Sequence, residues 1–522
     1  MATSLNFKKG LDLPLWRPLS PAITAPVAGG SLAWDMRNDA SRHPLTYLLR
    51  SSTALDCYSP ANDDWMPLAS PALAGTFTSG ATAIMHPSQG PRGTLAAGST
   101  TTTVVLSTAL PTAVGLNQLA DRGDGVGFTI RIITNTAGGA GKIEERKIVG
   151  NTAGTTPTLT LDSALSGAPA SGAAYEILSG RVFMLSAGTA AAGVWKHYDI
   201  ATNSLSGNLS ITNLPATIGT DSAALALAEV YVSSDRVPGS GFVSGGATYD
   251  AAARNCIQAT AAGATTITGS GMPASLIANE YTNFQVRVVE DTTTPTAVGQ
   301  RRVISSHTSG ATGVFTVAAW AVTPSATAKF VIENNDDLIL LRSSATTSVY
   351  AYSISGNTWS TATFAAAGNA HGAGVVLAQA FGIPRDPTGN RRHSHIFCIR
   401  GGVSASIDML DIANGANGTW SNDIAYGGKA QTFATGTSGA YDPVTLAGQW
   451  LHLNVNGTQR FTRFNMLAAV MEPETYLRFP QGSAAVGQKV SMHYLIDGAT
   501  KLALLDHLTQ SQVNAFSLAI QG

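Results

Sequence analysis

The sequence predicts an all-β protein with more than one core, and three observations support this prediction. At 522 residues the chain is too long for one small domain. Only 12% of it is charged, and long stretches consist of Ala, Thr, Ser, Gly and Val. Thr and Val favour strands, whereas Gly and Ser favour the turns between strands. Regular alternation of apolar residues argues against disorder, which is the competing interpretation of such a composition.

A short repeat of strand, turn and strand recurs along the chain. Each copy begins on an aromatic or large apolar residue and ends on Trp or another large apolar residue. The copies are Tyr58–Trp65, Tyr198–Leu205, Tyr352–Trp359, a longer-turned Leu410–Trp420 and a degenerate Phe464–Met471. Another strand precedes each copy, and small-residue strands lie upstream of several, at Ser79–Thr82, Ser244–Ala247 and Ser438–Tyr441. Small residues suit an innermost strand, where sheets converge and bulky side chains do not fit.

This pattern of strand, Asn/Gly turn and Trp resembles the kelch motif. In that family the turn joins the third strand of a blade to the fourth, and the Trp packs between adjacent blades. The resemblance implies a kelch-like β-propeller, and the C-terminal strands at 490–495 and 502–505 bring the expected number of blades to about six. An ordinary β-sandwich is the alternative.

A longer repeat explains why the first three copies are so far apart. Residues 128–133, 146–149, 159–161 and 175–177 align with 284–289, 301–304, 315–317 and 330–332, and the spacings agree to within about one residue. We therefore expect two homologous small β-barrels or sandwiches, each inserted between the inner strand of a blade and its second strand. The Arg-rich strand Arg301–Ile304, with Phe315 and Trp320 after it, resembles small β-modules inserted in bacteriophage virion proteins.

These repeats predict the domain boundaries. An N-terminal arm spans 1–30, and the propeller spans 31–89, 180–253 and 335–522. The inserted domains span 90–179 and 254–334. The Pro-rich arm is expected to be extended and to dock onto a neighbouring subunit. Residues 222–229 are the exception to an all-β chain, because they favour a short helix or a buried connector.

Some propellers are enzymes, and these carry characteristic sets of catalytic residues. The turns that end at Trp359 and Trp420 lack the Asp and Gly of the sialidase box, and no copper-oxidase set of Cys-modified Tyr and two His stands out. His393 and His395 would share one strand face as a metal pair, but Cys398 would point to the opposite face, so a polar loop entering a buried strand is favoured. The acidic pairs Asp63–Asp64, Glu144–Glu145 and Asp336–Asp337 are expected to be solvated, with calcium binding a minor alternative. We predict no catalytic, cofactor-binding or metal-binding residues and no enzyme activity.

Charge, hydropathy and cysteine content indicate which kinds of partner and cellular environment to expect. The net charge of −1 gives no electrostatic reason to expect nucleic acid or a charged membrane as partner. No apolar run is long enough to span a bilayer, and the first residues do not resemble a signal peptide. Cys57, Cys256 and Cys398 are far apart, so free buried thiols are favoured over a disulfide.

The resemblance to phage virion proteins gives the expected function. It implies a structural protein of the virion, assembled in the host cytoplasm, most simply a tail nozzle or hub subunit that forms a homo-oligomeric ring around the DNA channel. Neck, baseplate and capsid-surface positions are the alternatives within the particle. Its partners would be other virion proteins, namely tail, adaptor or portal, and fibre proteins. A glycan-binding or receptor-binding propeller of the tail or capsid surface is the alternative, and a propeller enzyme is the third. No sequence-specific nucleic acid and no membrane span are expected.

Overall fold

The computed structural model describes strands and the connections between them. The described residues are 16–18, 31–34, 46–51, 54–59, 64–68, 77, 81–86, 89–121, 127–135, 140–186, 188–189, 194–219, 222–227, 256–272, 276–343, 346–379, 383–384, 391–392, 395–402, 404–428, 430–441, 450–456, 460–466, 468–473, 475–476, 490–494, 500–506 and 513–519. Within these ranges there is no α-helix, and one 3₁₀ turn lies at Pro295–Ala297. The chain is therefore all-β, as the sequence predicts.

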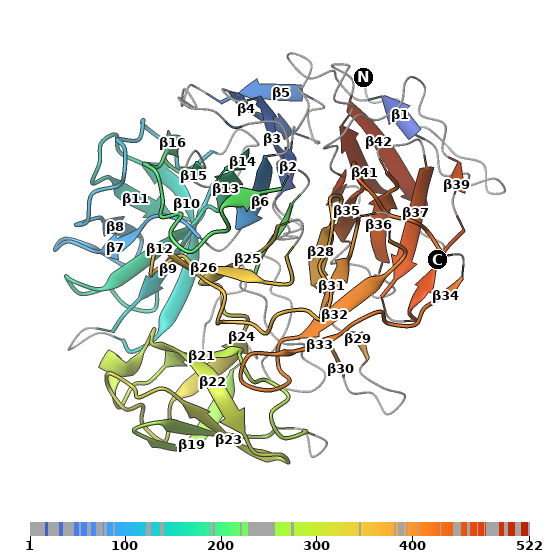
Figure 1. Ribbon diagram of the computed structural model, residues 1–522. Coiled ribbons are helices and arrows are strands. Elements are labelled where there is room, and N and C mark those ends of the chain that lie inside the picture. The colour runs from blue at the N-terminus through green and yellow to red at the C-terminus, as the bar shows by residue number, and fades with distance from the viewer. Residues whose placement is uncertain are drawn as a thin grey trace.

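Antiparallel sheets radiate from a common centre (Figure 1). Five of them have four strands each, and the first four of these are β2(Ser31–Trp34)-β3(Thr46–Ser51)-β4(Ala54–Ser59)-β5(Asp64–Pro67), β6(Thr82–His86)-β13(Arg181–Leu185)-β15(Trp195–Asp199)-β16(Ser204–Leu205), β18(Ala223–Ala226)-β25(Leu338–Arg342)-β26(Tyr350–Ser353)-β27(Thr358–Ser360) and β28(Val376–Gln379)-β31(His395–Ile399)-β32(Ile407–Asp411)-β33(Thr419–Ser421).

Two further sheets complete the ring. One contains β35(Ser438–Tyr441), β36(Trp450–Asn454), β37(Arg460–Asn465) and β38(Val470–Met471), with the short β34(Gly427–Gly428) and β39(Thr475–Tyr476) beside them. The other is β1(Trp16–Pro18)-β42(Val513–Ala519)-β41(Thr500–Asp506)-β40(Val490–Tyr494). The innermost strand of each sheet contacts the innermost strands of its two neighbours. These contacts run in the closed order β2, β6, β18, β28, β35, β40 and back to β2. This is the arrangement of a β-propeller.

The short repeat marks the outer two strands of these sheets. In every copy the first and last residues are directly paired across the hairpin: Tyr58 with Trp65, Tyr198 with Leu205, Tyr352 with Trp359, Leu410 with Trp420, and Phe464 with Met471. The five copies of the repeat therefore correspond to five hairpins whose end residues are paired.

Two of the Trp side chains connect neighbouring sheets. The indole N–H of Trp359 donates to the carbonyl of Ser210, in the connection that follows the preceding sheet, at 3.1 Å. Trp420 does the same to Ala365 at 2.8 Å. The Trp thus has the inter-blade position that the kelch-like pattern predicts.

Three expectations need correction or fall outside the described residues. Ala223–Ala226 form the strand β18 rather than a helix, because this segment pairs with β25 as the inner strand of its sheet. The small-residue strand at 244–247 lies outside the described residues. Part of the expected arm, Trp16–Pro18, pairs with β42 of the same chain, so these residues belong to the propeller. Antiparallel pairing of the N-terminal strand with the C-terminal one closes the ring.

The first insertion connects β6 to β13. It contains β7(Arg92–Thr94), β8(Thr103–Val105), β9(Thr129–Ile133), β10(Ile143–Asn151), β11(Thr158–Leu161) and β12(Ala174–Leu178), hydrogen-bonded in the order β7-β12-β9-β10-β11-β8. An isolated bridge between Leu95 and Leu106 brings the ends of this sheet together. We call this domain the first barrel.

The second insertion connects β18 to β25. It contains β19(Ile257–Gly263), β20(Thr266–Ser270), β21(Gln285–Glu290), β22(Arg301–His307), β23(Thr312–Val317) and β24(Lys329–Glu333). These strands form a closed barrel in the order β19-β20-β23-β22-β21-β24, which matches the order in the first barrel. We call it the second barrel, and it lies at the bottom of Figure 1, coloured yellow-green.

The structure shifts one part of the alignment between the barrels by a residue. Arg131 pairs with Glu145 on the next strand, and Arg287 pairs with Arg301, so Glu145 and Arg301 are equivalent. The sequence alignment had placed Arg146 opposite Arg301. Hydrogen bonds agree with the structural register, because Arg146 donates to the Ala164 carbonyl and Arg302 donates to the Ala319 carbonyl.

The barrels differ in how their cores connect to the propeller. Among the described residues, the core of the first barrel consists mainly of the barrel's own side chains and includes Ala201 of the propeller, with Ile200 packed against it. The core of the second barrel continues without a break into the propeller, through Leu340, Ala351 and Leu410 among others. Ile133 and Ile143 of the first barrel also belong to this second core.

Candidate functional site

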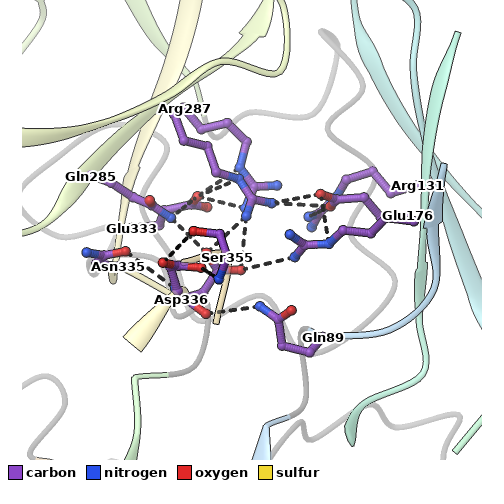
Figure 2. A network of polar contacts seen from close by, with 12 residues as sticks. Gln89, Arg131, Glu176, Gln285, Arg287, Glu333, Asn335, Asp336 and Ser355 are labelled. Atoms are coloured by element: carbon purple, nitrogen blue, oxygen red, sulfur yellow. Dashed lines mark hydrogen bonds and ion pairs between the residues drawn. The ribbon is translucent and has the colours of Figure 1, made fainter. Parts of the chain in front are cut away.

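A group of charged side chains, most of them buried, lies where both barrels meet the propeller (Figure 2). We call this cluster the polar junction. Its charged members are Arg92, Arg131, Glu145 and Glu176 from the first barrel, Arg287, Arg301 and Glu333 from the second, and Asp336 from the connection into the propeller strand β25. Four arginines thus face four carboxylates. Arg92 lies at the exposed edge of the cluster, and the buried charges are tolerated only because they are paired.

Arg301 is the residue that connects all three parts. Its guanidinium contacts both oxygens of Asp336, at 3.0 and 3.2 Å. It also contacts both oxygens of Glu176, at 3.3 and 3.2 Å. Its Nε lies 3.9 Å from Glu333. One side chain of the second barrel therefore binds a carboxylate of the first barrel, one of the propeller connection and one of its own barrel.

Each barrel also holds its own arginine at an equivalent position. Arg131 is bound between Glu145 at 2.7 Å and Glu176 at 2.9 Å. Arg287 binds Glu333 at 2.7 Å. On the adjacent strand, the residue paired with this arginine is Glu145 in the first barrel and Arg301 in the second. The Arg301 side chain binds Glu176 and Asp336. The two barrels thus differ at this position, and the second supplies a cation to the first.

Glu176 shows the electrostatic balance of the junction. Burial alone would raise the pKa of this carboxyl, but Arg301, Arg92 and Arg131 outweigh that effect and hold its pKa far below the ordinary value. Burial and the nearby Arg287 lower the pKa of Arg301, but Asp336, Glu176 and Glu333 raise it further, so the net pKa is above normal. Both groups are therefore charged throughout the physiological range.

Amide side chains extend the junction to neighbouring sheets. Gln89, just after β6, donates to the carbonyl of Asp336 at 3.0 Å. Gln285 donates to the carboxylates of Glu333 and Asp336, at 2.9 and 3.1 Å. Asn334 and Gln379, the latter at the end of β28, exchange two hydrogen bonds of 3.2 and 3.1 Å. The connection that leaves the second barrel is thus hydrogen-bonded toward the sheets on both sides of the sheet that it enters.

Main-chain contacts hold the barrels against each other beside these charges. The N–H of Asp291 donates to the Gly141 carbonyl at 2.7 Å, and Lys142 and Glu290 form an antiparallel bridge. A Cβ at Gly141, where φ is +64°, would lie 2.5 Å from the Asp291 carbonyl oxygen. This position therefore needs glycine for both its backbone angle and the close approach of the second barrel.

Each barrel is also anchored to an outer turn of the propeller. In the first barrel Gln118 donates to the carbonyl of Ala201, in the turn between β15 and β16, at 3.0 Å. In the second barrel Asn283 donates to the carbonyls of Ile412 and Gly415, in the turn between β32 and β33, at 2.5 and 3.4 Å. The junction and these anchors fix each barrel at two separate places.

The acidic pairs were expected to be solvated, and the structure corrects this for two of them. Glu144 and Glu145 are buried on β10, and Asp336 is buried in the junction. Glu144 accepts hydrogen bonds from Ser166, at 3.0 Å from its N–H and 2.8 Å from its hydroxyl. Asp64 is exposed, as expected, and Asp63 lies outside the described residues. Asp336 is buried where the two barrels meet the propeller, a long-range contact that the local sequence does not reveal, whereas Glu144 is paired within the first barrel.

The histidine pair gives no assembled site. His395 is buried on β31, with its Nε2 3.6 Å from Asp411, and His393 lies outside the described residues. Cys398 is buried, and burial raises the pKa of its thiol to about 12. The described part of the chain holds no group of three or more His, Cys, Asp and Glu residues arranged to bind a metal ion. Nor does that part include a helix long and apolar enough to cross a membrane.

Sequence reasoning missed the polar junction, although one signal was present. Arg131 and Arg287 occupy the same position in the two copies, in the middle of otherwise apolar strands. A charge on the buried face of a strand requires a partner. A search on the next strand would have found Glu145 opposite Arg131. In the second copy that position holds Arg301, a like charge, and the partner of Arg287 is Glu333 on another strand.

Comparisons with known proteins do not identify a family. No protein-family model matches the chain, and no curated protein matches it. Among solved structures, the chain is similar to the β-propeller domain of Cps50 (Swd1) from Myceliophteria thermophila, with 7% identity and a TM-score of 0.23 over 65% of this chain and 94% of that one.

Two enzymes are matched at the same low level. The GH93 α-L-arabinofuranosidase of Fusarium graminearum has 10% identity and a TM-score of 0.24, with 65% of this chain and 90% of that one covered. The NanB sialidase of Streptococcus pneumoniae has 8% identity and a TM-score of 0.21, with 97% and 94% covered. Similarities this distant say nothing about the activity of this chain. The assignment of the β-propeller fold is based on the sheets described above.

Proposed function

We propose that this protein is a non-catalytic structural subunit of a bacteriophage virion, one of a ring of identical copies in a tail nozzle or hub. The proposal starts from the resemblance of the inserted modules to those of phage virion proteins. The observation that best supports it is the contact of Arg301 with Glu176, Glu333 and Asp336, which connects both barrels to the propeller.

A structural role explains why so many charged side chains are buried together in the polar junction. Each buried pair needs good geometry to offset the cost of desolvation, so such pairs contribute more to a defined arrangement than to net stability. A propeller with two barrels held at fixed angles presents the same contact surfaces in every copy. A ring needs this property, because small errors of angle between identical subunits accumulate around it.

Binding of glycans or a receptor is the alternative, and the aromatic residues argue against it. A glycan platform needs exposed Trp or Tyr rings. Among the Trp side chains that the structure describes, Trp65, Trp195, Trp320 and Trp359 are buried and Trp420 is half-buried. Their rings pack inside sheets and barrels, which favours the structural role.

The test is the mass of the full-length protein in solution, with negative-stain imaging of the same sample. Closed rings, or a monomer that forms rings only with other tail components, would support the proposal. A stable monomer that binds defined glycans and no virion protein would overturn it in favour of receptor binding. Turnover of a sugar polymer would favour an enzyme instead.

A matched pair of variants sharpens this test. Arg301→Met removes the central cation of the junction, whereas Arg463→Met removes an ion pair with Glu472 at the surface of another sheet. We expect Arg301→Met to reduce ring formation and Arg463→Met to leave it unchanged. Equal assembly of both variants would show that the fixed barrel angles are not needed for the ring.

A further inference from the structure

The sequence contains three Asn-Gly pairs, Asn414-Gly415, Asn417-Gly418 and Asn456-Gly457. Such pairs can deamidate without an enzyme. The main-chain nitrogen of the glycine attacks the side-chain carbonyl carbon of the asparagine, forms a cyclic succinimide and releases ammonia. Water then opens the ring to aspartate or isoaspartate. Glycine permits the attack because it has no Cβ to obstruct the ring.

Hydrogen bonds restrain two of these asparagines. The Nδ2 of Asn417 donates to the Ala362 and Thr363 carbonyls at 2.6 and 3.3 Å, and the N–H of Gly418 donates to the Gly415 carbonyl at 3.4 Å. Both the group attacked and the attacking nitrogen are therefore engaged.

Asn456 is held just as firmly. Its Oδ1 accepts from the N–H of Ala434 at 2.5 Å and from the hydroxyl of Thr437 at 3.0 Å, and its Nδ2 donates to the Thr432 carbonyl at 2.9 Å. These bonds must break before the side chain can rotate toward the next residue.

Asn414 differs from both. Its side chain is exposed, as is Gly415, and Gly415 has a φ of +84°. Within the described residues neither the Asn414 side chain nor the Gly415 N–H makes a hydrogen bond. The Asn414 carbonyl accepts from Thr419 at 2.8 Å, so the main chain is ordered while the reacting groups are free.

We propose that Asn414 is a site of spontaneous deamidation and that its conversion weakens the docking of the second barrel on the propeller. The same turn carries the Ile412 and Gly415 carbonyls that Asn283 binds. Isoaspartate lengthens the main chain by a methylene between residues 414 and 415, and either product adds a negative charge to the turn. Both changes disturb the carbonyls that anchor the barrel.

The first experiment measures the rate at each site. The full-length protein is incubated in warm, mildly alkaline buffer, and aspartate and isoaspartate are located by peptide mapping with mass spectrometry. We expect Asn414 to convert roughly tenfold faster than Asn417, because breaking the hydrogen bonds of Asn417 adds to its barrier. Conversion of Asn417 or Asn456 at the rate of Asn414, or an intact Asn414, would overturn the proposal.

The same protein in concentrated urea is the control for sequence effects. Unfolding removes the hydrogen bonds, so the rates at the three pairs should converge there. A difference that persists in urea would show that the neighbouring residues, and not the fold, select the site.

The second experiment tests the consequence for the barrel. Asn414→Asp mimics one product, and Asn414→Ser cannot deamidate. We expect hydrogen exchange around Asn283 to be severalfold faster in Asn414→Asp than in the native chain, and unchanged in Asn414→Ser. Unchanged exchange in both variants would refute the effect on docking.

Discussion

At the scale of single residues, the first prediction concerns Arg301, which contacts carboxylates of both barrels and of the connection into the propeller. Its replacement by Met would leave Glu176 and Asp336 buried with fewer cations beside them. Removing one partner of a buried ion pair costs about 3–5 kcal/mol, because the remaining charge is left uncompensated. We therefore expect Arg301→Met to lower the free energy of unfolding by about this amount, measured by urea denaturation.

The matched control is Arg463, which pairs with Glu472 at 2.7 and 2.9 Å where both side chains are about one third exposed. Water and salt screen such a pair, so Arg463→Met should cost no more than about 1 kcal/mol. Equal losses for the two variants would contradict a special role for the junction.

A second prediction at this scale concerns pH and the buried His86 next to the junction. Burial is the main cause that lowers its pKa from 6.5 to about 4, although Asp336 acts in the opposite direction and Arg92 and Arg181 reinforce it. The unfolded chain takes up a proton near pH 6.5, whereas the folded protein does so only near pH 4. Stability should therefore fall as the pH drops from 6.5 to 4.

His86→Gln is the variant that measures this contribution. Between pH 6.5 and 4 it should reduce the slope of the unfolding free energy against pH by the contribution of roughly one proton. This reduction is independent of any change in stability at neutral pH. An unchanged slope would mean that His86 is not the group that titrates. His371, whose pKa burial lowers to about 3, provides an independent comparison through His371→Gln.

At the scale of elements, the turns of the short repeat can be dissected with matched asparagines. Asn203 and Asn357 both have positive φ, 49° and 46°, and both accept a hydrogen bond of 2.8 Å from the Tyr that begins the repeat. Only Asn357 also accepts from the N–H of Ser210, which follows the preceding sheet, at 2.9 Å. The difference between the two sites is therefore one bond between sheets.

Asn357→Ala should cost more stability than Asn203→Ala, by about 1 kcal/mol, the net value of one hydrogen bond. Asn357→Gly, which tolerates the positive φ, should recover only the backbone part of the loss. The check is urea denaturation of all three variants. Equal losses for the two alanine variants would rule out a contribution from the inter-sheet bond.

The strands and hairpins could be predicted from the sequence because their signals are local. Aromatic and apolar residues seven positions apart place Tyr352 opposite Trp359, and the other copies pair in the same way, including the longer-turned Leu410–Trp420. The alignment of the barrels was off by one residue at Arg301, since Arg146 and Arg301 look alike when only residue types are compared. Ser222–Glu229 favours a helix by composition, but pairing with β25 outweighs that preference in β18.

At the scale of the whole molecule, the candidate site could not be predicted in the same way. Glu144–Glu145 and Asp336–Asp337 look like surface charges because the residues that bury them are distant in the sequence. Glu176 and Arg301 meet across 125 residues, and only the packing of one barrel on the other brings them together. Local sequence shows that Arg131 needs a partner, but not that Arg301 also reaches the same carboxylate.

The two barrels should separate from the propeller in a defined order when the junction is broken. The first barrel has a core of its own, whereas the core of the second continues into the propeller. In Arg301→Met we therefore expect β9–β12 to lose protection from hydrogen exchange at lower urea than β21–β24, which should remain as protected as the propeller strand β25. In the native chain and in Arg463→Met all three regions should open together. Earlier opening of the second barrel would show that its continuous core contributes less to docking than the anchor of the first barrel at Ala201.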